Sequence, residues 1–304
     1  MILLNNRKQR VIKIAHQLFI EKGFQATSIQ DILDYSGISK GTFYNYFSSK
    51  SELLIALFKS IYKQLDKDTN EMLIGQDASD IGILIKQIEL HLKTSRANKL
   101  LFLFEEVMVS NDPDLKEYLK QNHLRNVSWI YSRFVDIFGE EKKPYLLDCS
   151  IMFIGMLQQH LKFNAMVNGS LLSNHEIVRY CVARIVNIVE EVSIANDKLL
   201  DPTLLTHWLP KRMKRSTAFR ENLHSSVIEL KKILHHSNEQ EKYFGLLDFI
   251  EEELLQSKSP RGFLIESALN SLKGGLTEIR DFEILKAIEQ LAADILSNPS
   301  DREE

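Results

Sequence analysis

The 304-residue sequence has little of what several protein classes require. Its only cysteines, Cys149 and Cys181, lie far apart in apolar stretches, which favours buried reduced thiols over a disulfide framework or a redox switch. No run reaches the roughly 18 apolar residues of a membrane-spanning helix. The start, MILLNNRKQR, has the wrong order and length for a signal peptide. We therefore expect a soluble cytoplasmic protein.

Sequence motifs of common enzymes are missing as well. There is no G-x-x-x-x-G-K-[ST], no G-x-G-x-x-G before a strand and no C-x-x-C pair. The only close histidine pair, His235 and His236, is a poor metal clamp, because adjacent residues diverge around a helix. The sequence thus predicts no enzyme, no cofactor and no metal site.

Most of the sequence instead has the period of amphipathic helices. Apolar residues make up 44% and charged residues 26%, as is typical of folded proteins, and this length predicts two or three domains.

The net charge is −3, but residues 1–50 hold seven Lys and Arg against three Asp and Glu. They therefore carry +4, and the remaining 254 residues carry −7. A basic head on an acidic body directs one end of the molecule towards a polyanion.

Residues 27–50 have the pattern of two short helices joined by a tight turn. Thr27 and Gln30 have the spacing of a capping box at the start of the first helix. Gly37 ends that helix, because glycine adopts the left-handed conformation at little cost. Ser39 then caps the second helix. A glycine-containing turn of three to four residues between short helices is a helix-turn-helix, so we predict DNA binding.

The outer side of the second helix carries residue types suited to DNA. With Phe43 and Phe47 buried, the residues that point outward are Lys40, Gly41, Thr42, Tyr44, Asn45 and Tyr46. Lys and Asn contact base edges in the major groove, whereas Thr and Tyr hydroxyls suit phosphate oxygens. Lys50 lies in the first turn of the next helix, whose positive end also favours a phosphate. The alternative is that Tyr44 and Tyr46 are ordinary half-buried aromatics and that Lys50 is a solvated cap.

Residues 8–55 resemble the DNA-binding domain of the tetracycline-repressor (TetR) family of bacterial transcription regulators. The matching positions are Gly23-Phe24, Thr27, Ile32, Gly37, Ser39-Lys40-Gly41-Thr42, Tyr44, Phe47, Lys50 and Leu53-Leu54. The resemblance implies an all-α fold, with an N-terminal three-helix DNA-binding domain and a helical dimerisation and ligand-binding body. It also implies a homodimeric repressor that binds an inverted repeat in double-stranded DNA and is released from this operator by an effector.

The resemblance assigns roles to individual positions. It places Lys40, Gly41 and Asn45 opposite bases, whereas Thr27, Thr42, Tyr44, Tyr46 and Lys50 hold phosphates. Asn45 and Tyr46 lie where family members vary, so the half-site sequence does not transfer. Together with the capping serine, the predicted DNA-binding set is Thr27, Ser39, Lys40, Gly41, Thr42, Tyr44, Asn45, Tyr46 and Lys50.

The division expected from these patterns is a DNA-binding domain over 1–50, a regulatory body over 51–196 and an extension over 197–304. Within the body, residues 142–167 and 173–196 predict two helices that are apolar on more than one face. In a TetR-like body such helices pack on the core and on the twin subunit. The alternative is a plain intramolecular core. We expect the dimer, because a two-fold pair presents one head to each half-site.

A ligand cavity is expected between Phe102 and Met156, where large apolar residues alternate with a few polar groups. The candidate lining residues are Phe104, Met108, Trp129, Phe134, Met152, Phe153 and Gln158. The alternative is that this stripe of Met and aromatic residues at helical spacing is ordinary core.

The resemblance does not explain residues 197–304. Helical segments near 216–236, 239–257, 261–272 and 277–297 predict a further small bundle, or a lid on the body. Because the segment is rich in large apolar residues and only slightly acidic, we expect a folded unit that modulates the body or receives a protein partner. An alternative function for the whole chain is a DNA-bound factor that recruits a protein for cell division or chromosome organisation, without a small-molecule ligand.

Overall fold

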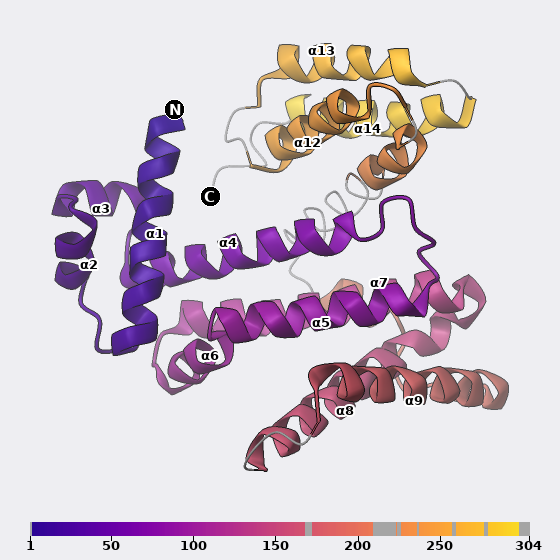
Figure 1. Cartoon of the computed structure of the whole chain (residues 1–304), viewed down its shortest axis with the longest axis horizontal. Coiled ribbons are helices and arrows are strands. Elements are labelled where there is room, and N and C mark those ends of the chain that lie inside the picture. The colour runs from indigo at the N-terminus through magenta and orange to yellow at the C-terminus, as the bar shows by residue number, and fades with distance from the viewer. Residues whose placement is uncertain are drawn as a thin grey trace. The chain divides into compact units, whose positions relative to one another are not determined.

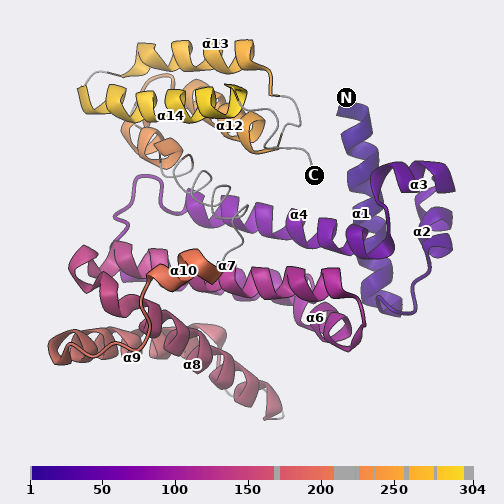
Figure 2. The same cartoon turned by 180° about the vertical axis from the view of Figure 1, so that it is seen from behind.

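The structure is a computed structural model that describes residues 2–167, 172–208, 223, 226–235, 237–256, 260–276 and 279–297. Every regular element in this described part is a helix, which confirms the predicted all-α fold (Figure 1, Figure 2). The chain divides into two compact units, residues 1–69 with 78–205 and residues 70–77 with 206–304. Among the described helices, none combines the length and apolarity needed to cross a membrane.

The first unit begins with the helices of the predicted head. They are α1 (Ile2–Lys22), α2 (Ile29–Ser36), α3 (Lys40–Tyr46) and α4 (Lys50–Glu71). Their apolar faces meet in one core, which includes Phe19, Ile32 and Phe43. Leu103 and Tyr118 belong to the same core, so α6 and α7 of the body pack directly against the head.

The body contains five longer helices. They are α5 (Ile81–Ala97), α6 (Leu100–Val109), α7 (Pro113–Phe138), α8 (Leu146–Met166) and α9 (Asn174–Ala195), followed by the short α10 (Thr203–Trp208). Asp112 caps α7, and Pro113 occupies its first turn, where the missing N–H of proline costs nothing. A 3₁₀ segment (Glu140–Tyr145) connects α7 to α8. A second core joins α5, α7, α8 and α9, and Leu205 of α10 packs into it.

A buried polar bridge holds the two points where the chain leaves and re-enters the first unit. Arg133, on α7, donates to Gln87 Oε1 and to the carbonyl oxygen of Ala78, each at 2.9 Å. Gln87, on α5, donates to the carbonyl oxygen of Thr69 at 2.8 Å. Asp136 balances the arginine charge at 2.6 Å. Because residues 70–77 belong to the other unit, both ends of that segment are fixed by the same two side chains.

The second unit is a helical bundle with its own apolar core. Its helices are a stretch over residues 226–234, α12 (Gln240–Gln256), α13 (Gly262–Leu272) and α14 (Ile279–Ser297). Three of the predicted segments are thereby found as helices; of the first, residues 216–222, 224, 225 and 236 lie outside the described residues. Their inner faces share one core. The buried Lys231 is paired with Asp248 at 2.6 Å.

The unit boundaries differ from the expected division. Residues 70–77 of the chain, between α4 and α5, join the second unit, where Gly75 lies against the ring of His235. The other boundary falls after Leu205, because α10 packs on the body core. Sequence position alone does not reveal an interrupted unit, since its two parts are more than a hundred residues apart.

Candidate DNA-binding site

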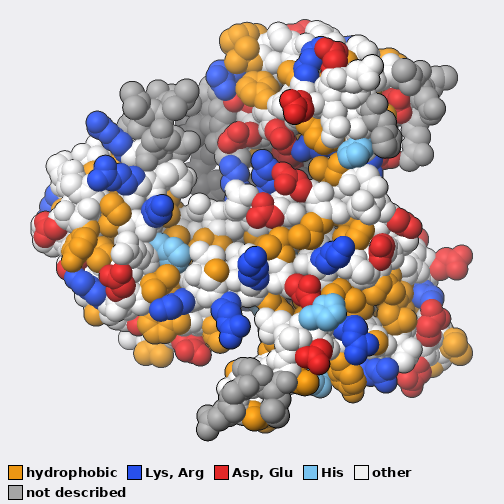
Figure 3. All heavy atoms as spheres, in the orientation of Figure 1, with side chains coloured by type: hydrophobic (Ala, Val, Ile, Leu, Met, Phe, Trp, Pro, Cys, Tyr) orange, Lys and Arg blue, Asp and Glu red, His pale blue; other side chains and the backbone are white. Residues whose placement is uncertain are grey.

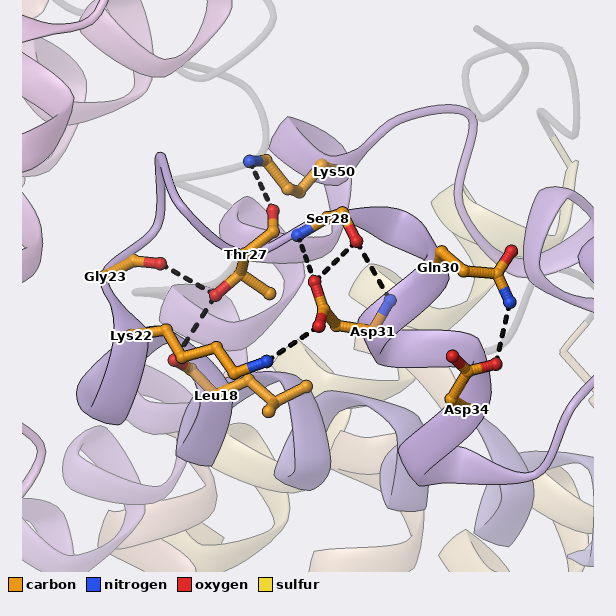
Figure 4. Close-up of polar contacts among 9 residues, drawn as sticks. All are labelled: Leu18, Lys22, Gly23, Thr27, Ser28, Gln30, Asp31, Asp34 and Lys50. Atoms are coloured by element: carbon orange, nitrogen blue, oxygen red, sulfur yellow. Dashed lines mark hydrogen bonds and ion pairs between the residues drawn. The ribbon is translucent and has the colours of Figure 1, made fainter.

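The first helix of the helix-turn-helix, α2, is capped by Ser28. Its hydroxyl oxygen accepts from the Asp31 N–H at 3.0 Å, and the Asp31 carboxylate accepts from the Ser28 N–H at 2.9 Å (Figure 4). The predicted capping box of Thr27 and Gln30 is therefore wrong by one residue, and Gln30 instead donates to Asp34 at 2.7 Å. Spacing did not separate the two choices, because Ser and Thr are both good helix caps.

Thr27 is fully buried in the loop between α1 and α2. Its hydroxyl lies 2.7 Å from the carbonyl oxygen of Gly23, to which it donates, and 3.3 Å from that of Leu18 (Figure 4). A buried hydroxyl that is already bonded cannot reach a phosphate. The predicted phosphate contact of Thr27 is therefore corrected: its side chain closes the loop.

The start of α2 is also tied to the end of α1 by an ion pair. Lys22 Nζ lies 2.7 Å from the Asp31 carboxylate. The hydrogen bond from Lys22, followed by those from Ser28, holds the pKa of the Asp31 carboxyl well below its usual range. Asp31 therefore fixes the N-terminus of α2 both by capping it and by pairing with α1.

The turn between α2 and α3 has the predicted geometry. Gly37 adopts φ +67° and ψ +32°, the left-handed conformation, at the end of α2. Ser39 caps α3, its hydroxyl oxygen accepting from the Thr42 N–H at 3.1 Å. Phe43 and Phe47 are both buried, as expected. The sequence therefore predicted the helix-turn-helix itself correctly.

The outward side of α3 carries the predicted residues. Lys40, Gly41, Tyr44 and Asn45 are exposed, whereas Thr42 and Tyr46 are half-buried. Tyr44 is 46% exposed even though its ring lies edge-on against Phe43. The hydroxyls and amide on this face remain accessible to a ligand outside the protein.

Gly41 has no structural need for glycine within the described residues. A Cβ built at this position meets only the Ser39 hydroxyl, at 3.9 Å, and its backbone is ordinary helix. Glycine in a helix costs up to about 1 kcal/mol relative to alanine. A surface that approaches the α3 backbone closely from outside would explain the glycine.

Lys50 lies at the start of α4, as predicted, but its ammonium group points into the protein (Figure 4). It donates to the carbonyl oxygens of Phe24 and Thr27, each at 2.7 Å, and lies 3.3 Å from that of Gln25. It also lies 4.5 Å from the centre of the Phe24 ring. An ammonium group has three donors, and these carbonyls use them all. The predicted phosphate contact of Lys50 is thus corrected to a contact within the head.

Exposed cations are also present on α1 and α3 of the head. Figure 3 shows Lys and Arg side chains spread over the head on the face in view. Arg7, Arg10, Lys13 and Lys40 are exposed. Exposed cations close to a recognition helix supply the sequence-independent part of DNA affinity.

The predicted ligand pocket is not assembled as expected. The ring of Phe104 packs on that of Phe58 beside the head core, with ring centres 5.2 Å apart. The rings of Phe134 and Phe153 pack on each other in the body core, with ring centres 5.6 Å apart. The exposed members are Met108, Met152 and Gln158. These residues do not line one cavity, because helical period alone does not show which neighbour each face meets.

Trp129 is the remaining member of the predicted set. It is half-buried and stacks on His91 of α5, with ring centres 4.3 Å apart. Burial lowers the pKa of His91 to about 4, so the ring is neutral near pH 7. Its Nε2 atom is buried and has no hydrogen-bond partner among the described residues. An unsatisfied buried polar atom beside an indole is a place where a ligand could add a hydrogen bond.

Comparisons with known proteins agree with this geometry. Residues 11–57, from α1 into α4, match the family model described as bacterial regulatory proteins, tetR family. Residues 11–57 therefore form a DNA-binding domain of the TetR type. Its helix-turn-helix is that of a DNA-binding transcriptional regulator.

Two TetR-type relatives match along most of the chain. The uncharacterized HTH-type transcriptional regulator YerO of Bacillus subtilis is 29% identical over 298 residues, which span 94% of this chain and 95% of that protein. The uncharacterized HTH-type transcriptional regulator YuxN of the same organism is 23% identical over 307 residues, 93% and 97% of the two chains. The transposon Tn10 TetC protein of Escherichia coli is 40% identical over 58 residues, only 19% and 29% of the two chains. No solved structure matches the chain significantly.

Three residues that hold this TetR-type head in place, Ser28, Asp31 and Glu106, were missed by sequence reasoning. Ser28 and Asp31 have capping-box spacing, so a local signal for them was present. Glu106 of α6 accepts a hydrogen bond from the Phe24 N–H, 82 residues away in sequence. No local pattern marks such a contact.

Proposed function

We propose that the chain is a homodimeric repressor, not an enzyme, which acts in the cytoplasm and leaves an inverted-repeat operator when an effector binds. The observation that carries this proposal is the exposed side of α3. It presents Lys40 and Asn45 beside accessible hydroxyls, together with Gly41, where the described residues leave room for a larger side chain. That combination suits the major groove, where Lys and Asn distinguish guanine and adenine.

Within this proposal the residues of α3 divide by role. Lys40 and Asn45 contact base edges, and Gly41 lets the helix backbone approach the groove. Ser39, Thr42, Tyr44 and Tyr46 donate to phosphate oxygens, which sets the register of α3 on the duplex. Since few cations are available, each head binds DNA moderately, and two heads on one dimer raise the affinity.

The dimer is proposed to form through α8 and α9. On α8 the residues Ile151, Met152, Phe163 and Met166 are exposed, and on α9 Tyr180 and Ile194 are exposed. At roughly 100° of rotation per residue, the four α8 positions fall within about 120° of one another and the two α9 positions within about 40°, so each set lies on one side of its helix. Large apolar groups that lie together at the surface of one copy indicate an interface. A two-fold pair then places two α3 helices about 34–36 Å apart, one turn of DNA.

The effector is proposed to bind in the body, beside Trp129 and His91. The unsatisfied Nε2 of His91 and the neutral state of its ring favour an uncharged molecule that hydrogen-bonds there. Arg133, the buried cation of the body, already has Gln87 and Asp136 as partners. Its charge therefore gives no reason to expect an anionic effector.

The DNA part of the proposal is tested by sequencing DNA that the protein binds in cells. We expect enrichment of one inverted repeat at a small number of promoters, and we expect Asn45→Ala to change the enriched sequence. Binding at many dispersed chromosomal sites, together with one co-purifying protein, would instead favour the DNA-bound recruiting factor. Wild-type protein that enriched no sequence would contradict both functions.

A further inference from the structure

The loop over residues 23–27 joins the end of α1 to the start of α2, and it is held by side chains from outside it. Gly23 has φ +89°, which only glycine adopts easily. Phe24 is buried and packs edge-on against Phe19, with ring centres 5.2 Å apart. Because Ser28 caps α2 immediately after this loop, the position of the loop decides where α2 begins.

The backbone polar groups of the loop are bound from two directions. Lys50 of α4 donates to the carbonyl oxygens of Phe24 and Thr27 at 2.7 Å. The Glu106 carboxylate of α6 accepts from the N–H of Phe24. Phe24 is therefore bound on its carbonyl side by a residue of the head and on its amide side by a residue of the body.

Glu106 also lies directly against Gly23. A Cβ added to that glycine would come within 2.6 Å of Glu106 Oε1, so a larger residue would displace the carboxylate. Glycine at this position is thus needed twice, for its backbone angle and for the approach of α6. The pair Gly23–Glu106 is a close contact between the head and the body.

The charges of Lys50 and Glu106 also influence each other. Desolvation lowers the pKa of the half-buried Lys50, and the negative charge of Glu106 is the largest influence that opposes this shift. Removing Glu106 would leave a buried ammonium group with less compensation. It would also leave the Phe24 N–H without this acceptor.

Two further polar contacts join the head to the ends of α6. His16 Nε2 lies 3.2 Å from the carbonyl oxygen of Asn98, just before α6 begins. The Ser51 hydroxyl donates to Asp112, just after α6 ends. Glu106 is the charged residue that reaches the α1–α2 loop from within α6. Glu106 is therefore the contact through which a change in the position of α6 would reach the loop.

We propose that Glu106 and Lys50 are positioning residues for DNA binding, which together hold the α1–α2 loop so that α2 and α3 are presented to DNA in one arrangement. Lys50 acts from inside the head and makes no phosphate contact. Glu106 is the point at which the body sets the affinity of the head. The proposal rests on the DNA-binding role of α3, but not on the dimer or the effector.

The test compares full-length Glu106→Gln and Glu106→Ala with Glu105→Gln, an exposed neighbour on the same helix. DNA affinity is measured at several salt concentrations, on the duplex enriched in cells and on a duplex of unrelated sequence. Amide hydrogen exchange of residues 24–27 is measured on the free proteins. We expect Glu106→Ala to bind both duplexes about tenfold more weakly, with unchanged salt slope and faster exchange at Phe24. Glu105→Gln should match the wild type.

Glu106→Gln keeps an oxygen that accepts from the Phe24 N–H, so it removes the charge alone and protects the test if the alanine variant fails to fold. We expect it to bind between the wild type and the alanine variant. Normal affinity together with normal exchange at Phe24 in Glu106→Gln and in any folded Glu106→Ala would overturn the proposed role of Glu106. Wild-type protein that bound neither duplex would refute the DNA-binding function instead.

Lys50 is tested by Lys50→Met, which keeps most of the chain length over the Phe24 ring but removes the ammonium group. We expect weaker DNA binding with an unchanged salt slope, because no phosphate contact is lost. Lys40→Ala, on the exposed side of α3, is the matched control and should lower the slope by about one unit. A slope lowered by about one unit in Lys50→Met, without faster exchange in residues 24–27, would restore the phosphate role.

Discussion

At Gly41 the backbone of α3 has room on its outer side that no described residue fills. The neighbouring side chains explain why: the buried Phe43 turns the opposite side of the helix inward, and Ser39 caps the first turn. The two lysines that were predicted to contact DNA have different surroundings in this head. Lys40 is exposed, whereas the ammonium group of Lys50 is used inside. What a single side chain can do depends on which neighbours already bind its donors and acceptors.

The first prediction follows from that unused room. Gly41→Ala should raise the free energy of unfolding by a few tenths to about 1 kcal/mol, since alanine is the better helix former and no described residue crowds its methyl group. It should also weaken operator binding by about tenfold or more, because the methyl group faces the groove. Thermal melts and DNA titrations measure the two effects.

Gly245→Ala, in α12, is the matched control, because a Cβ there also meets nothing within 4 Å among the described residues. It should raise stability without changing DNA affinity. If Gly41→Ala bound DNA as well as the wild type, close approach of α3 at that position would be refuted.

His91 gives the second prediction, on pH. The unfolded chain binds a proton at His91 below about pH 6.5, whereas in the folded chain burial lowers the pKa of this ring to about 4. Between these values the unfolded state binds more protons, so stability is complete above pH 6.5 and decreases as the pH falls towards 4. The full difference is on the order of 3 kcal/mol. Denaturant unfolding at each pH measures it.

His91→Phe keeps an aromatic ring against Trp129 but cannot titrate, so this variant should lose much of the decrease between pH 6.5 and 4. His123→Gln, on the exposed side of α7, should leave the decrease unchanged. An equal loss of stability with pH in the wild type and in His91→Phe would show that His91 is not the group responsible.

For the secondary-structure elements, short-range sequence signals predicted the turns and helix ends, whereas tertiary packing decided which helix faces meet. The turn from Gly37 to Ser39 was predicted correctly, because a left-handed glycine and a serine cap act within a few residues. The pocket residues on α6, α7 and α8 were not found together. Helical period places them on faces, but only packing decides whether a face meets the core, as at Phe153, or the surface, as at Met152.

The outer faces of α8 and α9 give the third prediction. Tyr180→Asp should yield folded monomers with much weaker operator binding, because it places a charge on the proposed interface, where Tyr180 is 49% exposed in one copy. Val186, also on α9, is half-buried, so it is a poorer site for this charge than the exposed Tyr180. Sedimentation velocity and DNA titration measure the two outcomes.

Leu101→Asp is the matched control, since Leu101 is also an exposed apolar residue but lies on α6. It should leave the oligomeric state unchanged. Wild-type protein that sedimented as a monomer at micromolar concentration would contradict dimerisation through α8 and α9.

At the scale of the whole molecule, the C-terminal unit is built from two separate stretches of the chain. Its smaller part, residues 70–77, begins within α4, the helix that starts at Lys50 in the head. The covalent path from the head to this unit is therefore one helix long. The Gln87–Arg133 bridge keeps Thr69 and Ala78 in place on the other side of that boundary.

The fourth prediction concerns removal of this unit. A chain ending after Leu205 keeps the apolar contacts of Leu204 and Leu205 with the body core, which a cut at the expected boundary after residue 196 would remove. It should stay soluble, dimerise and bind the operator, because the cores of the head and of the body are complete. Amide exchange should become faster in residues 70–77, which lose the rest of their unit, and the response to an effector or a partner should change.

A truncated chain that failed to fold would place the extension in the main core and refute its independence. Arg133→Met in the full-length protein provides a second measurement. It should speed exchange near Thr69 and Ala78 while leaving exchange in α3 unchanged.

The helices, the helix-turn-helix and its resemblance to the TetR family could be predicted from the sequence alone, because caps, turns and helical period act over a few residues. It also identified the outward residues of α3, from Lys40 to Asn45, since two buried phenylalanines fix the orientation of so short a helix. The folded structure was needed to show that Lys50 binds carbonyl oxygens inside the head and that Glu106 reaches Phe24. It alone also joined residues 70–77 to the C-terminal unit. These contacts unite residues that are distant along the chain, and the spacing of residues in the sequence carries no information about which distant surfaces meet.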